Sequence, residues 1–134
     1  MVENLTQEEK ELLLKDLCAR LPYGVKVNVI YSNENASSFR QRVCVEGDNE
    51  LNTDIIGLYQ RNEIDIKPYL FPMSYIDDNE KLFAEYITTL TYDSNTHSAV
   101  PTIKTFDFYN KYHIDYRGLI EKGLALDATG KNIY

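Results

Sequence analysis

Residues 6–31 read TQEEKELLLKDLCARLPYGVKVNVIY, and this stretch decides the fold because it places a helix directly before a strand. Thr6 and Glu9 have the spacing of a capping box, in which each side chain accepts from the backbone amide of the other residue. Pro22-Tyr23-Gly24 is a sequence that ends a helix. Between these signals lies an apolar stripe at helical spacing, which predicts an inner face of Leu13, Leu14, Leu17, Cys18 and Leu21.

The residues after Gly24 alternate with a period of two, which indicates a β-strand. Val25, Val27 and Val29 take one side of this predicted strand, which extends to Tyr31. Further alternation predicts three more strands, separated by polar residues and turns. We expect a loop over 32–38, a second strand over 39–46, a turn over 47–49, a third strand over 53–59 and a fourth over 63–67, which Pro68 stops.

The second half of the chain has helical rather than alternating patterns. Leu82, Phe83, Tyr86, Ile87 and Leu90 follow helical spacing and predict a helix over 77–91. We expect a crossover over 69–74, a loop over 92–101, a helix over 105–113 with Thr105 as its N-cap, and a short helix over 119–122.

This order of elements predicts an α+β fold. The expected architecture is a small antiparallel β-meander or open barrel of about four strands, preceded by one helix and followed by two or three helices. Strands that follow one another through short links usually pair as neighbours. The sequence has no repeat and no low-complexity tract, so we expect a single domain over residues 1–134.

The net charge of −7 is concentrated in the middle of the chain, where residues 44–96 carry eleven acids against three bases. Such a surface would repel phosphates, so no nucleic-acid partner is expected, although Arg40 and Arg42 leave a weak basic cluster. No apolar run is long enough for a membrane span, and the first residues do not form a leader. Cys18 and Cys44 are expected to be reduced, buried thiols, and the predicted compartment is the cytoplasm.

The sequence lacks the motifs of known catalytic and cofactor sites. Gly130-Lys131 resembles the end of a phosphate-binding loop, but Asn132 replaces the required Ser or Thr. Cys18, Cys44, His97 and His113 show no paired metal-ligand spacing. We therefore predict no catalytic residue, no cofactor and no metal.

The densest polar cluster is His113-Ile114-Asp115-Tyr116-Arg117, and His113, Asp115, Tyr116 and Arg117 are the candidate binding residues. One hypothesis is that Asp115 orients His113 as an acid–base pair. The alternative, which the sequence favours, is structural. In it His113 caps the preceding helix, Asp115 caps the next one, and Arg117 pairs with the acidic middle segment.

Several stretches together resemble a family of short uncharacterised proteins found in gut Bacteroidales genomes and their phages or prophages. The resemblance runs nearly end to end, implies a mobile-element origin and carries over no activity and no catalytic residue. It rests on LLKDLCARLPYGVKV at 13–27, IKPYLFPMS at 66–74, FDFYN at 106–110, DYRGLI at 115–120, GLA at 123–125 and DATG at 127–130.

The favoured hypothesis for function is a non-enzymatic protein-interaction or accessory module of phage or prophage origin. Its basis is the absence of a catalytic pattern, the resemblance and the 11 tyrosines, a residue type enriched at interfaces. The partner would be a host or phage protein, and the protein itself a monomer or homodimer. The alternative is a small hydrolase or transferase that uses His113, Asp115 and Arg117.

Overall fold

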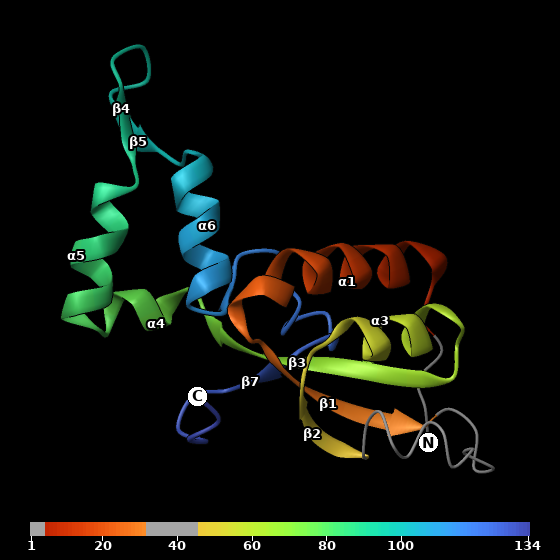
Figure 1. Cartoon of the computed structure of the whole chain (residues 1–134). Helices are drawn as coiled ribbons and strands as arrows, with labels where there is room; N and C mark the ends of the chain where they lie inside the picture. Colours follow the sequence, from red (N-terminus) through yellow and green to blue (C-terminus); the bar gives the residue numbers. More distant parts are fainter. Residues whose placement is uncertain (1–4, 32–45) are drawn as a thin grey trace.

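The structure is a computed structural model and describes residues 5–31 and 46–134. It has the predicted α+β fold class. A mixed sheet has the helices α1 (Gln7–Arg20) and α3 (Thr53–Gln60) packed on one face, as Figure 1 shows. A second group of helices projects from the end of this two-layer body.

Helix α1 begins as predicted, because both hydrogen bonds of the Thr6–Glu9 capping box are present. It passes into a short 3₁₀ turn, η1 (Leu21–Tyr23), and Gly24 ends it in the left-handed conformation at φ 68°. The buried face is Leu13, Asp16, Leu17 and Arg20. The prediction of a buried Cys18 was wrong: its side chain is exposed, because two charged residues take the inner positions. Cys44 lies outside the described residues.

The sheet has the strand order β2-β1-β3-β6, and β7 also pairs with β3. Strand β3 is antiparallel to β1 but parallel to β6 and β7, so the described strands form a mixed, open sheet. The specific prediction of a meander or barrel of consecutive strands is therefore not confirmed. The bounds are β1 (Lys26–Tyr31), β2 (Gly47–Glu50), β3 (Ile64–Pro72), β6 (Ile114–Asp115) and β7 (Leu126–Asp127).

The predicted third strand is helix α3. Asn52 caps it by accepting from the amide of Ile55, and its inner face is Ile55, Ile56, Leu58 and Tyr59. Those positions also fit a strand rich in β-branched residues, so the cap decides between the two structures. The turn predicted at 47–49 is strand β2. The strand predicted over 39–46 and the loop over 32–38 lie outside the described residues, except for Glu46.

Pro68 does not stop the fourth strand, contrary to the prediction. Strand β3 pairs with β1 up to Pro68, and beyond it pairs with β7 and β6. A proline lacks the amide that would continue a ladder. The proline therefore marks the point at which β3 exchanges one partner for two others, and the crossover predicted over 69–74 is largely strand.

Residues 74–112, which we call the arm, contain three helices, and a β-hairpin joins the second to the third (Figure 1). The helix predicted over 77–91 is α5 (Glu80–Thr88), and Asn79 caps it by accepting from the amide of Leu82. A separate short helix, α4 (Ser74–Asp77), precedes it and overlaps the predicted range only at Asp77. The predicted loop over 92–101 contains a hairpin, β4 (Thr91–Asp93) and β5 (Ser98–Val100). Helix α6 is Ile103–Lys111.

Two further details of the arm and tail differ from prediction. The N-cap of α6 is Thr102 and not Thr105, which lies at the N3 position, where its hydroxyl accepts from the amide of Thr102 at 2.9 Å. Residues 119–122 form turns rather than a short helix.

The described chain has two apolar cores. The larger lies between the sheet and helices α1 and α3, and the smaller packs the helices of the arm against β6. The smaller core consists of Ile76, Leu82, Phe108, Tyr109 and Ile114.

The phenol of Tyr134 completes the sheet where the β1–β3 ladder ends. Its hydroxyl accepts from the amide of Lys26 at 2.8 Å and donates to the carbonyl of Tyr69 at 2.7 Å. The ring stacks on His113 with centroids 3.9 Å apart. The last residue thus connects two strands of the sheet with the base of the arm.

Replacement of Tyr134 by Phe should lower the free energy of unfolding by about 1 kcal/mol, because two backbone groups lose their partner while the ring stacking is kept. Urea denaturation measures this loss. Tyr23→Phe is the matched control, since Tyr23 is an exposed tyrosine on η1, and it should change stability by less than about 0.5 kcal/mol. Equal effects of the two variants would contradict the bridging role.

Candidate functional site

The four candidate residues of the sequence cluster do not converge on one site. His113 faces a cleft at the base of the arm. Asp115 is buried in β6, and Tyr116 and Arg117 lie beside helix α1. The cluster is therefore continuous in sequence but divided in space.

Asp115 caps a turn, whereas the structural alternative predicted that it would cap a short helix. One carboxylate oxygen accepts from the amide of Leu119 and the other from the amide of Ile120, both at 2.9 Å. Each oxygen is thus committed to the backbone, and neither bonds His113. The structure does not form the acid–base pair that the alternative hypothesis requires.

Arg117 pairs with α1 and not with the acidic middle segment, so that prediction was wrong. Its Nε lies 3.1 Å from Asp16 Oδ1, and Arg20 Nε lies 2.8 Å from the other carboxylate oxygen. Asp16 and Arg20 are both 0% exposed. Arg20 also donates to the carbonyls of Tyr109 at 3.3 Å and Ile114 at 2.6 Å. This group of charges fastens the arm and β6 to α1.

Tyr116 lies between charged and aromatic neighbours. Its ring centroid is 4.7 Å from the Arg117 guanidinium and 5.6 Å from that of Arg20, which are cation–π distances. It also stacks on Tyr109, with centroids 5.1 Å apart. The ring thus covers the buried charges and extends the aromatic packing of the arm.

His113 is 8% exposed and takes the left-handed conformation, φ 60°, directly after α6. Burial first, and then the charge of Arg20, lowers the pKa of His113 to about 4. The ring is therefore neutral at pH 7, and its Nδ1 has no hydrogen-bond partner. The sequence predicted that His113 caps the C-terminus of α6. In the structure this cap is the backbone amide of His113, which donates to the carbonyl of Asn110.

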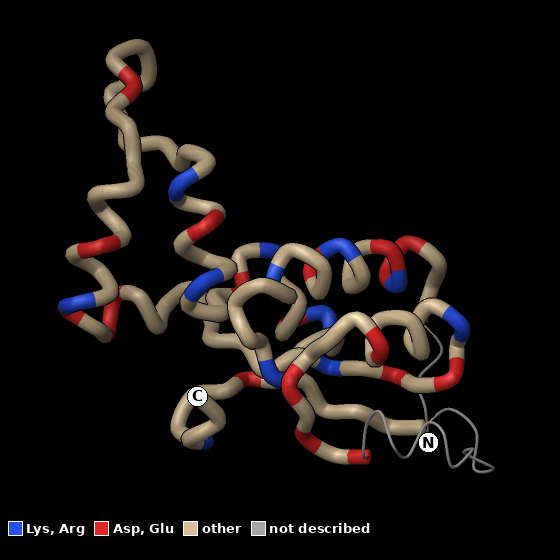
Figure 2. The backbone as a smooth tube through the Cα atoms, viewed as in Figure 1, with Lys and Arg blue, Asp and Glu red and all other residues tan. Residues whose placement is uncertain are grey.

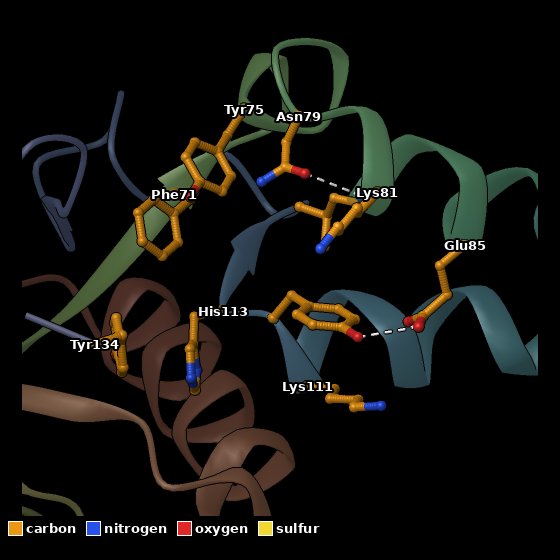
Figure 3. A pocket seen from close by; sticks show the side chains of 10 residues that line it. Phe71, Tyr75, Asn79, Lys81, Glu85, Lys111, His113 and Tyr134 are labelled. Atoms are coloured by element: carbon orange, nitrogen blue, oxygen red, sulfur yellow. Dashed lines mark hydrogen bonds between the residues drawn. The ribbon is translucent and has the colours of Figure 1, made fainter.

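The cleft beside His113 has a volume of about 630 Å³ and lies between the end of β3 and the arm (Figure 3). Its walls are mainly aromatic, and its charged groups are Lys81, Lys111 and Glu85. The lining residues are Phe71, Tyr75, Asn79, Lys81, Leu82, Glu85, Lys111, Tyr112, His113 and Tyr134.

The other face of the arm carries a connected row of rings, which we call the apolar ridge. Centroid distances are 6.4 Å for Phe83–Tyr86, 6.1 Å for Tyr86–Tyr109, 5.9 Å for Tyr109–Phe106 and 5.3 Å for Phe106–Tyr116. Ile87 lies one helical turn after Phe83 and adds to the ridge. The side chains of Phe83, Ile87 and Phe106 are 43%, 51% and 41% exposed.

Sequence analysis missed both the cleft and the ridge. The excess of tyrosines was the available signal, but composition does not show which rings meet. The predicted inner face of α5 included Phe83 and Ile87, which the structure exposes.

Within residues 5–31 and 46–134, no three His, Cys, Asp or Glu side chains are placed to hold a metal ion together. No described helix has the length and apolar composition needed to cross a membrane. No protein-family model, curated protein or solved structure matches the chain. The resemblance to Bacteroidales and phage proteins therefore remains a prediction.

The depressed pKa of His113 predicts that acid destabilises the protein. An unfolded histidine binds a proton near pH 6.5, whereas the folded His113 does so only near pH 4. Between these values the unfolded state holds more protons, so the free energy of unfolding should fall by about 3 kcal/mol as the pH falls through this window.

The measurement is urea unfolding at a series of pH values for wild type and His113→Asn, since asparagine tolerates the left-handed backbone. The variant should lose this part of the pH dependence. Parallel curves for the two proteins would show that His113 is protonated as easily when folded as when unfolded.

Proposed function

We propose that this protein is a protein-interaction module that binds a partner protein through the apolar ridge. The observation that carries the proposal is the concentration of exposed apolar side chains on the arm. Over the described residues, five of the nine large hydrophobic side chains that are exposed lie between positions 83 and 106: Phe83, Ile87, Tyr92, Ile103 and Phe106.

The ridge has the properties of a binding surface rather than of scattered surface residues. Its exposed rings continue into the buried rings of Tyr109 and Phe108, so the arm core holds them in place. Aromatic anchors that are already ordered lose little conformational entropy on binding. Rings of this kind contribute most of the binding free energy at protein interfaces.

The charge around the ridge indicates the type of partner. Residues 74–112 carry six acids and three bases, and Figure 2 shows acidic positions on α5 and in the β-hairpin. A second copy of this chain, with a net charge of −7, would be repelled. The fitting partner is a different protein with an apolar surface bordered by Lys and Arg.

Substitution of exposed side chains in the apolar ridge should abolish binding of the partner without unfolding the chain. Three immobilised proteins are exposed to the same cell lysate: the wild type, the ridge variant Phe83→Ser/Ile87→Ser and the control Tyr23→Ser. Circular dichroism checks that each is folded. Tyr23 is an exposed ring on the body. A true partner is retained by wild type and by the control but lost by the ridge variant.

The identified partner is then purified, and its affinity is measured. The ridge variant should bind at least about tenfold more weakly, as expected for loss of interface anchors. The association rate of the wild type should fall as salt is added, because opposite charges steer the encounter. If wild type, ridge variant and control retain the same proteins equally, the ridge is not the binding surface.

A further inference from the structure

The cleft at the base of the arm is cationic although the chain as a whole is acidic. Lys81 and Lys111 line it, and neither forms an ion pair with any residue of the described chain. The one carboxylate, Glu85, already accepts from the hydroxyl of Tyr112 at 3.0 Å. Lys111 Nζ also lies 5.1 Å from the ring centroid of Tyr112, which is a cation–π contact. Neither ammonium group is paired with a carboxylate, so both can donate hydrogen bonds to an anion.

The walls of the cleft are flat and apolar. Phe71 and Tyr75 stack with centroids 4.2 Å apart and planes inclined by 19°. Tyr134 lies 5.9 Å from Phe71 and stacks on His113, so the two ring pairs adjoin, as Figure 3 shows. Surfaces of this kind favour a planar ring, which can stack or meet them edge to face.

The uncharged polar groups of the cleft also suit such a ligand. The side-chain oxygen of Asn79 accepts from the amide of Leu82, which leaves the amide nitrogen as a donor. The ring of His113, which stacks on Tyr134, also lines the cleft.

We propose that this cleft binds a small aromatic anion, with its flat ring against Phe71, Tyr75 and Tyr134 and its acidic group held by Lys81 and Lys111. The volume of about 630 Å³ lies in the range of sites for small molecules. The acidic group is a carboxylate or a phosphate, since both accept from ammonium groups.

This site is separate from the ridge. Lys81 and Glu85 lie one turn apart on α5. Phe83 lies two residues after Lys81, and Ile87 lies two residues after Glu85. Two residues of an α-helix correspond to about 200°, so the two pairs occupy opposite faces. Ligand binding and partner binding can therefore be tested independently.

The experiment is a titration of the whole chain followed by amide NMR spectra and by calorimetry. The probes are benzoate and adenosine monophosphate, each compared with its uncharged counterpart, benzamide or adenosine, and with inorganic phosphate alone. At least one ring-bearing anion should bind and shift the amide signals of Asn79, Lys81 and His113. Its uncharged counterpart and phosphate should each bind at least about tenfold more weakly. Which anion binds identifies the acidic group.

The decisive variant is Lys81→Gln/Lys111→Gln, which should weaken binding of that anion at least about tenfold. The matched control is Lys122→Gln/Lys131→Gln, which makes the same change in net charge at two exposed lysines outside the cleft. Equal weakening by both variants would show only a general charge effect and would overturn the proposal. So would binding of the uncharged counterpart as tightly as the anion, binding of phosphate as tightly as the ring-bearing anion, or no shift with any probe.

Discussion

The buried guanidinium of Arg20 is the interaction on which the rest of the structure depends. It comes from α1, yet it donates to the carbonyl of Tyr109 in the last turn of α6 and to that of Ile114 in β6. Helix ends leave such carbonyls without partners, and a cation there is also favoured by the helix dipole. Asp16 balances the charge at 2.8 Å. A buried ion pair is weak evidence for stability on its own, but removal of one partner costs about 3–5 kcal/mol.

Both proposed surfaces are positioned by this contact. On one side, Tyr116 lies over the Arg20 guanidinium and begins the row of rings that ends at Phe83. On the other side, the same positive charge helps to keep the His113 ring of the cleft neutral. The arm therefore presents an apolar face for a partner and a cationic, aromatic cleft for a small anion, and one buried side chain fixes the orientation of both.

Local signals in the sequence predicted what local interactions determine. The capping box of α1 was sufficient because its two residues lie three positions apart. The alternation of β1 was sufficient because a strand with one buried face shows a period of two whichever strands it pairs with. The strand predicted over 53–59 was wrong because its apolar spacing fits either structure, and the cap at Asn52 was the overlooked signal. Arg20 could not be predicted, since the carbonyls that it bonds lie 89 and 94 residues away. Similarly, the cluster from His113 to Arg117 suggested one site, but Asp115 is committed to the amides of Leu119 and Ile120.

The most direct test of this account is native-state hydrogen exchange in wild type and Arg20→Met. If Arg20 couples the arm to the body, the amides of α6 in the variant should exchange about a hundredfold faster, while those of Val27 and Val29 in β1 keep most of their protection. Unchanged exchange in α6, or an equal loss of protection in α6 and β1, would show that Arg20 does not hold the arm in place.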